Sequence, residues 1–285
     1  MAGFTADWLA LREAADHASR SARVADVAAQ QLPRADGTVL DLAAGTGSNL
    51  RYLVERLPRT RDWLLADHDA ILLAASVDRM AEWARARGYQ VIATGQEIRL
   101  DRDGTSVRVQ RLCEDLSRLD DRLFVGRSLV TASALLDLVS DAWLEALAGR
   151  CRASGAAALF ALTYDGRIEV TPREPLDEEV RSLVNRHQQT DKGFGPALGP
   201  GAVASAARCF AARGYEVIRA RSDWILSRDH RDLQRELVEG WAAAAIEMDP
   251  TRARLIDDWQ TTRLKHVEAG RSEMVVGHED LAAWL

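Results

Sequence analysis

A short segment of small and polar residues, 41–49, has the residue types and spacing of a ligand-binding turn. An apolar run over residues 38–42 leads directly into it, and the turn contains Gly45 and Gly47. A helix with one apolar face is expected over residues 48–57. A strand, a glycine turn and a helix bring backbone N–H groups and a helix N-terminus close to a bound ligand. The segment therefore predicts a site for a nucleotide-like ligand.

The spacing of the glycines argues against two common nucleotide sites. A dinucleotide turn needs a third glycine where this chain has Leu50, and the Lys-Ser/Thr ending of a phosphate loop is missing. An acid, Asp41, lies inside the strand four residues before Gly45. This arrangement resembles motif I of the class I S-adenosylmethionine-dependent methyltransferases, an apolar strand ending in Asp or Glu and then Gly-x-Gly-x-Gly. The sequence departs from that motif at Ala43, where the family has its first glycine.

Three later segments follow in the order that this resemblance implies. The apolar run 63–66 ends in Asp67, which the family uses to accept both ribose hydroxyls, whereas Asp69 is the better helix cap. The alternating strand 107–112 leads to an acid and an apolar residue that would contact the adenine. A third apolar run, 128–132, leads into a small-residue segment beside the methionine part of the cofactor. The cofactor residues that the resemblance implies are Asp41, Ala43, Gly45, Thr46, Gly47, Asn49, Asp67, His68, Asp115, Leu116, Ser133 and Ala134.

Residues outside the central motifs are candidates for the remaining roles. Arg12, one helical turn after Trp8, is a candidate for the cofactor carboxylate, with a surface arginine as the alternative. Asp137 would lie near the substrate mouth, or act as a solvated or capping carboxylate. Tyr164 directly follows the fifth expected strand and is a further polar candidate for catalysis.

The segment 164–200 is expected to line the substrate site, because this connection often does so in the fold. An apolar helical stripe in it ends at His187, and the polar loop 188–196 with its two glycines is typical of a lid. His187 is a candidate general base, with a hydrogen-bonded core histidine as the alternative.

Composition limits the possible partners of the chain. It has 285 residues, 47% of them apolar, and a net charge of −6, so a basic nucleic-acid-binding surface is not expected. No apolar run is long enough to span a membrane, and no signal peptide is evident, which predicts a cytoplasmic protein. The three cysteines are scattered and the six histidines dispersed, so neither disulfides nor a metal site is expected.

The alternation of strands and helices predicts one α/β domain over residues 1–285. Its fold class is a Rossmann-like doubly wound sheet of seven strands, the last antiparallel as the resemblance implies. A helical cap is expected over 1–33 and a helical insertion over 229–269, which would form either a second pocket wall or a homodimer contact. The expected strands lie near 38–42, 62–66, 107–112, 127–132, 156–163, 215–221 and 273–276.

The resemblance implies an enzyme that transfers the methyl group of S-adenosyl-L-methionine to a small molecule. Two alternatives stay open: other chemistry on the same cofactor, such as cyclisation or aminocarboxypropyl transfer, and a non-catalytic cofactor-binding or partner subunit. The acceptor would be attacked through an O, N or C nucleophile, and the sequence does not distinguish among these.

Overall fold

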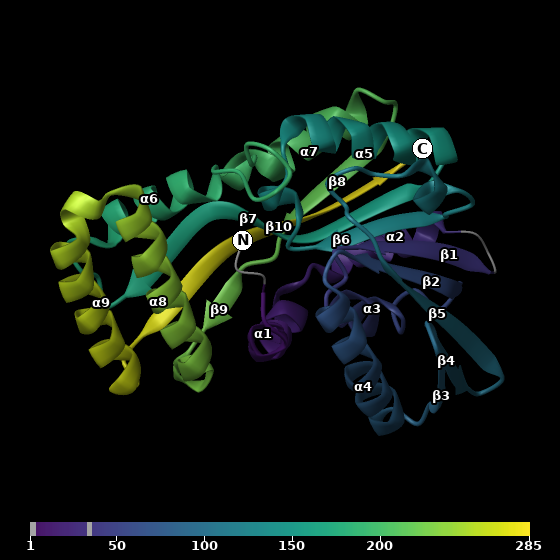
Figure 1. The fold of residues 1–285 in the computed structure, drawn as a ribbon, viewed down its shortest axis with the longest axis horizontal. Coiled ribbons are helices and arrows are strands. Elements are labelled where there is room, and N and C mark those ends of the chain that lie inside the picture. The colour runs from purple at the N-terminus through teal and green to yellow at the C-terminus, as the bar shows by residue number, and fades with distance from the viewer. Residues whose placement is uncertain (1–3, 33–35) are drawn as a thin grey trace.

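One continuous, mostly parallel sheet organises the protein. The structure is a computed structural model that describes residues 4–32 and 36–285 (Figure 1). Residues 1–3 and 33 of the expected N-terminal cap lie outside the described residues. The strand order is β3-β4-β5-β2-β1-β6-β7-β10-β8, with the short β9 paired to β10. The strands are β1 (Gly37–Leu42), β2 (Thr60–Asp67), β3 (Gln90–Thr94), β4 (Glu97–Arg102), β5 (Thr105–Cys113), β6 (Leu129–Ser133), β7 (Ala157–Thr171), β8 (Glu216–Arg221), β9 (Trp224–Leu226) and β10 (Glu273–Trp284).

The pairing confirms the expected doubly wound sheet with an antiparallel last strand, but the described residues form ten strands rather than the seven expected, since β3, β4 and β9 are additional. Strands β5, β2, β1, β6 and β7 run parallel, and β10 runs antiparallel between β7 and β8. Both faces of the central strands are buried, which agrees with their nearly continuous apolar runs. Helices α5 (Asp141–Ser154) and α7 (Ala202–Ala211) cover one face; α2 (Ala22–Gln31), α3 (Ser48–Leu53) and α4 (Ala70–Ala86) cover the other.

Short local features join these elements, and one helix is shorter than expected. Gly155 ends α5 in the left-handed conformation with φ 70°, and a turn at Asp103-Gly104 joins β4 to β5. Strand β3 pairs with β4, so β3 and β4 extend the sheet beyond β5. Helix α3 ends at Leu53 rather than at Leu57, because the chain tightens there into a hydrogen-bonded turn.

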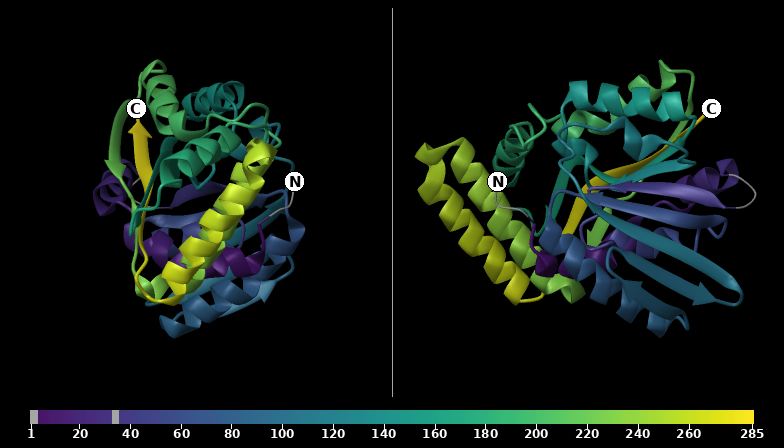
Figure 2. Two further views of the ribbon diagram at one scale, coloured as in Figure 1. Left: turned by 90° about the vertical axis from the view of Figure 1, so that its left-hand side faces the viewer. Right: turned by 45° about the vertical axis from the view of Figure 1, so that its right-hand side comes forward.

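The longest strands extend beyond the other parallel strands and carry a second layer of helices. The ends of β7 and β10, with β9, pack against α6 (Asp177–Gln188), α8 (Arg231–Met248) and α9 (Ala253–Glu268) around a core of their own. We call this part the distal lobe; it contains the two helices expected in the insertion before the last strand. Figure 2 shows α9 on its outer side. No helix in the described ranges is long and apolar enough to cross a membrane.

Helix α1 (Ala6–Ser19) lies between the distal lobe and the central sheet (Figure 1). It contacts β9 and α8 on one side and α3 on the other. Residues three or four apart share one face of a helix, and the residues between them lie on other faces. One helix can therefore contact two neighbours through different side chains. Helix α1 therefore adjoins both the glycine turn and the lobe.

Candidate functional site

The glycine turn adopts a strained, left-handed backbone at the carboxyl end of β1. Ala43 has φ 52°, Gly45 has φ 53° and Gly47, which precedes α3, has φ 81°. A Cβ at Gly45 would lie 3.0 Å from Leu9 of α1, so glycine is needed there for space as well as conformation. A left-handed Ala43 costs about 1–2 kcal/mol relative to glycine. Ala43 thus adopts the left-handed conformation that glycine prefers, although its side chain disfavours that conformation.

Asp67 at the end of β2 holds this turn in place. Its Oδ2 accepts the Gly45 N–H at 2.7 Å, and its Oδ1 accepts the Asp69 N–H at 2.9 Å. Asp69 caps α4, as predicted, by accepting from Ile71. A carboxylate has about four acceptor positions, so Asp67 can accept further hydrogen bonds although it is buried. The neighbouring His68 is exposed, with its Nδ1 3.3 Å from Asp67.

A buried polar network lies beneath the turn. The Asn49 Nδ2 group donates to Asp41 Oδ1 at 2.7 Å and to Thr131 Oγ1 at 3.2 Å. Arg20, directly after α1, donates from Nη1 to Asn49 Oδ1 at 2.6 Å. The network joins β1, β6, α3 and the N-terminal helices at one point.

Two atoms of this network have no hydrogen-bond partner among the described residues. They are Oδ2 of Asp41 and Nε of Arg20, both buried. Burial raises the pKa of Asp41 to about 7, with the Asn49 hydrogen bond and the Arg20 charge acting in the opposite direction. Burial likewise lowers the pKa of Arg20. Unpaired buried polar groups are costly, so this arrangement suits a polar ligand group.

The segment after β5 combines an exposed acid with a buried leucine. Asp115 accepts from the backbone N–H and the hydroxyl of Ser117, both at 2.9 Å. Leu116 packs into the core below α5, and its carbonyl accepts the Trp143 indole N–H at 2.7 Å. Phe194 packs edge-on against Trp143, with ring centroids 5.6 Å apart. The predicted lid loop therefore touches the helix that fixes the Leu116 backbone.

The chain after β6 turns sharply beside the glycine turn. Ser133 and Ala134 are half-buried, and Ala134 has φ 53° with its N–H donating to Ala161. Asp137 follows in a short 3-10 turn and is buried, with no described hydrogen-bond partner for its Oδ1. Burial raises the pKa of Asp137 to about 6, while the nearby Arg12 charge and the Tyr164 N–H lower it.

Arg12 contacts its own helix and the distal lobe. Its Nε donates to Asp16 Oδ2 at 2.9 Å, and its guanidinium lies over the Trp224 ring, 4.8 Å from the centroid. The Trp224 indole N–H donates to Asp16 Oδ1 at 3.0 Å. The predicted carboxylate-binding arginine is therefore already paired with an acid of the chain.

Tyr164 and His278 are cross-strand neighbours on β7 and β10. Their ring centroids lie 6.2 Å apart, and His278 lies 5.0 Å from the Trp224 ring. The Tyr164 hydroxyl donates to Asn185 at 2.7 Å, and burial raises the pKa of Tyr164. We call the buried group at this sheet edge the edge cluster. It consists of Arg12, Asp16, Asp137, Tyr164, Trp224 and His278.

His187 lies apart from these residues, at the end of α6. Its Nε2 is 3.3 Å from Glu247 of α8, and its Nδ1 is 3.4 Å from the Lys192 amine. Burial and the Lys192 charge lower the pKa of His187. Its contacts join the lid loop to the distal lobe, whereas Asp137 and Tyr164 lie together in the edge cluster.

Helix α1 is fastened to the glycine turn through polar contacts. Glu13 forms a two-pronged ion pair with Arg51, whose Nη1 donates to the Thr46 carbonyl at 2.6 Å. His17 Nε2 lies 3.1 Å from both the carbonyl and the hydroxyl of Ser48. These contacts, with Leu9, bury Gly45 and Thr46.

Sequence reasoning missed Arg20, Thr131, Trp224 and His278 as site residues. The expected last strand ended at Val276, but β10 continues to Trp284 and brings His278 to the sheet edge. The sequence signal for His278 was Gly277, because a glycine inside an apolar strand often marks a bulge. The strand register shifts at this point, and such a bulge changes the direction of the side chain that follows.

Comparison with known proteins gives matches among solved structures alone. A scan against protein-family models and a search of curated proteins found no match. The cyclopropane synthase MmaA2 from Mycobacterium tuberculosis is 11% identical, covering 92% of this chain and 82% of that chain, with a TM-score of 0.45. A SAM-dependent methyltransferase from Thiobacillus denitrificans, in complex with S-adenosyl-L-homocysteine, is 13% identical over 99% of each chain, with a TM-score of 0.44. An O-methyltransferase family protein from Burkholderia thailandensis is 18% identical, covering 70% of this chain and 52% of that chain, with a TM-score of 0.40.

Proposed function

We propose that this protein is an S-adenosylmethionine-dependent enzyme that transfers a methyl group to a small-molecule acceptor. The observation that carries the proposal is the left-handed turn at residues 43–47, set between the buried acids Asp41 and Asp67 at the carboxyl ends of β1 and β2. Ligands of open α/β sheets bind at this edge. The acid before the turn and the absence of a phosphate-loop lysine favour a sulfonium nucleoside over a nucleotide.

The residues fit the groups of this cofactor. The unpaired Oδ2 of Asp41 suits the ammonium of its amino acid part, and the unpaired Nε of Arg20 suits the carboxylate. Asp67 has acceptor positions left for ribose hydroxyls, and the exposed carboxylate of Asp115, just after β5, is the acceptor we assign to the adenine amino group. When bound, the cofactor supplies an electrophilic methyl group that needs no activation by a metal.

The chain's own contribution is alignment, exclusion of water and handling of one proton. Helix α1 and the distal lobe bury the edge cluster and so exclude water from it. Asp137, with a raised pKa and an unpaired oxygen, can accept the proton that an O–H or N–H nucleophile loses. It is a better placed base than His187, whose partners are Glu247 of α8 and Lys192 of the lid loop.

Calorimetric titration with S-adenosylmethionine tests the cofactor assignment. We expect binding to the wild type, and a loss of about 1–3 kcal/mol in binding free energy for Asp67→Ala, since ribose hydrogen bonds are lost. Asp69→Ala is the matched control, because it removes the cap of α4 and leaves Asp67 in place. The absence of binding heat and of any competition by S-adenosylhomocysteine would sink the proposal.

Product analysis tests the chemistry. Incubation with a metabolite extract and S-adenosylmethionine should accumulate S-adenosylhomocysteine in proportion to a methylated product. Accumulation of methylthioadenosine instead would show attack at another carbon of the sulfonium and would replace methyl transfer by the alternative chemistry. Binding without any turnover would favour the non-catalytic alternative.

A further inference from the structure

His278 is a buried member of the edge cluster. It is 5% exposed, and its backbone N–H donates to Asp223 Oδ1 at 3.2 Å. The register of β10 against β7 shifts at this point, between Val276 and His278. A bulge of this kind re-aims a side chain relative to its neighbours in the strand.

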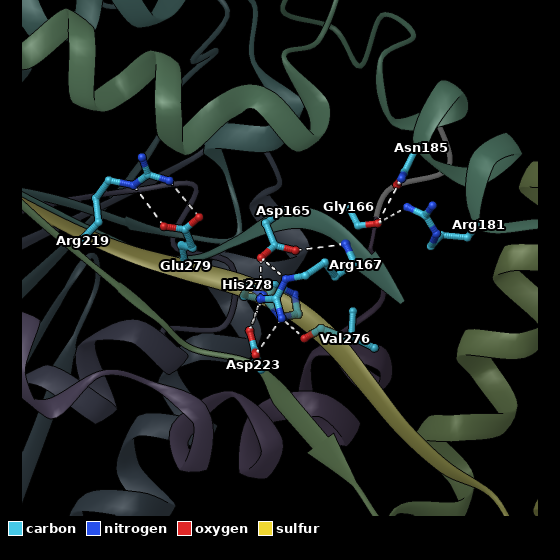
Figure 3. A network of polar contacts seen from close by, with 10 residues as sticks. All are labelled: Asp165, Gly166, Arg167, Arg181, Asn185, Arg219, Asp223, Val276, His278 and Glu279. Atoms are coloured by element: carbon cyan, nitrogen blue, oxygen red, sulfur yellow. Dashed lines mark hydrogen bonds and ion pairs between the residues drawn. The ribbon is translucent and has the colours of Figure 1, made fainter. Parts of the chain in front are cut away.

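An ion-pair network lies next to this bulge (Figure 3). The guanidinium of Arg167 pairs with both Asp165 and Asp223, each with an N–O distance of 2.6 Å. A Cβ at Gly277 would lie 2.1 Å from Asp165 Oδ1 and 2.7 Å from Arg167 Cβ. The network therefore occupies the space beside Gly277, the residue that precedes His278.

The hydrogen bond of Nδ1 determines which nitrogen of His278 carries the proton. Nδ1 lies 3.0 Å from the Val276 carbonyl, which can only accept, so Nδ1 is protonated. Burial lowers the pKa of His278 to about 3, and the Arg12 charge acts in the same direction; the Arg167 charge adds to this, and the Val276 carbonyl and Asp223 oppose it. Nε2 then has a lone pair and no hydrogen, and the described part of the chain offers it no hydrogen-bond donor.

Asp137 provides a second unpaired acceptor in the same cluster. The backbone N–H of Tyr164 lowers the pKa of the Asp137 carboxylate, and the Tyr164 ring packs against His278. The Arg12 guanidinium lies over the Trp224 ring, which in turn packs against His278. Arg12 itself is neutralised by Asp16 at 2.9 Å. The cluster therefore has two free acceptors and no free cation.

We propose that His278 and Asp137 bind the acceptor molecule through two of its hydrogen-bond donors. The site then selects a small molecule that has two hydroxyl or amine groups, bound beside His278 and its aromatic neighbours Tyr164 and Trp224. Carboxylates and phosphate esters are disfavoured, because they meet a carboxylate and a bare nitrogen lone pair. The inference rests on the proposed function for the identity of the acceptor, but the two free acceptors are a property of the apoprotein.

Nitrogen-15 NMR of histidine-labelled protein tests the state of His278 without any ligand. We expect a neutral ring with the proton on Nδ1 and a bare Nε2, unchanged from pH 5 to pH 8. A proton on Nε2, or titration of the ring within that range, would overturn the assignment. His278→Gln serves to identify the signal.

Matched probes test the ligand class. Resorcinol carries two O–H donors on a ring, 1,3-dimethoxybenzene has the same skeleton without donors, and 3-hydroxybenzoate replaces one donor by an anion. We expect resorcinol to bind at least about fivefold more tightly than either, with an upfield shift of His278 Nε2. Equal binding of the three probes contradicts the proposal.

Two variants separate a binding role from a structural one. His278→Leu should reduce resorcinol binding at least about fivefold, whereas His278→Gln, which keeps a polar acceptor, should restore most of it. Both variants are compared by their unfolding midpoint, and equal loss of binding in both at equal stability contradicts the proposal. The probes are titrated with and without S-adenosylhomocysteine. Probe selectivity without cofactor binding would leave this inference intact while the proposed function fails.

Discussion

The indole N–H of Trp143 donates to the carbonyl oxygen of Leu116 at 2.7 Å, and this bond ties α5 to the segment after β5. Trp143 also carries the Phe194 ring of the lid loop on its other side. One side chain therefore connects the expected adenine side of the site to the loop expected to cover the substrate.

Trp143→Phe tests this connection. The substitution leaves the Leu116 carbonyl without its partner in a buried place, so we expect a loss of about 1–3 kcal/mol in the free energy of unfolding. Hydrogen exchange should accelerate at residues 114–117. Trp83→Phe is the control: Trp83 lies in α4 and stacks on Tyr89, which follows the helix, so its substitution should leave residues 114–117 unchanged. Unaltered exchange at 114–117 in Trp143→Phe would show that the bond does not order the segment.

Glu13→Gln tests the fastening of α1 to the glycine turn. The Arg51 side chain is 2% exposed, so loss of the charge on Glu13 leaves a buried guanidinium without its counter-ion. We expect a loss of about 1–3 kcal/mol in unfolding free energy and faster hydrogen exchange over residues 6–19. Glu178→Gln removes an exposed pair with Arg181 and should change neither measurement. The same exchange rate in α1 for both variants would contradict the role given to Glu13.

The raised pKa of Asp41 predicts a pH dependence of stability. The carboxyl is protonated in the folded protein up to about pH 7, and in the unfolded chain it is ionised above its ordinary pKa of 3.8. The folded state thus binds one more proton, and its stability falls by about 1.4 kcal/mol per pH unit as the pH rises between these values. Asp137 and Asp280 contribute in the same direction.

Asp41→Asn isolates the contribution of Asp41 to this slope. Urea unfolding of the ligand-free protein from pH 4.5 to pH 6.5 should give a flatter dependence for the variant than for the wild type. Asn49 can still donate to the new side-chain oxygen, so the network keeps that bond. Parallel slopes for the two proteins would mean that Asp41 is already ionised in the folded state.

Gly277→Ala tests the packing behind His278. The added methyl group would overlap Asp165 Oδ1, so we expect the free energy of unfolding to fall by about 1–3 kcal/mol. Gly240→Ala in α8 meets no atom within 4 Å and should instead stabilise the protein by about 0.5–1 kcal/mol. Chemical denaturation of both variants gives the comparison, and a neutral Gly277→Ala would show that the ion-pair network moves aside.

Local signals predicted much of the fold. The apolar runs of β1, β2, β5 and β6, the Asp69 cap, the Gly155 helix end and the helices of the insertion are all encoded within a few residues. The expected end of α3 lies four residues too far along the chain. Val54 and Leu57 are buried in the turn that follows the helix, so they continue its apolar pattern although they are not helical.

The site was less accessible to such reasoning, because its contacts join distant parts of the chain. Asp67 holds Gly45 across 22 residues, and Trp224 reaches Asp16 across 208. The pairing of Arg12 with Asp16 is a helical i, i+4 contact and could have been read from the sequence. The position of His278 depends on β10, and the sequence pattern predicted that this strand would end at Val276.

The length of β7 and β10 limits how the two parts of the protein can move. The strands, 15 and 12 residues long, remain paired from the central sheet into the distal lobe. The lobe lies beyond the ends of the shorter parallel strands. A hinge between lobe and sheet would have to break several ladder hydrogen bonds at once. Access to the turn and the edge cluster therefore falls to α1, which contacts both, and the sheet is a fixed frame against which this one helix can open.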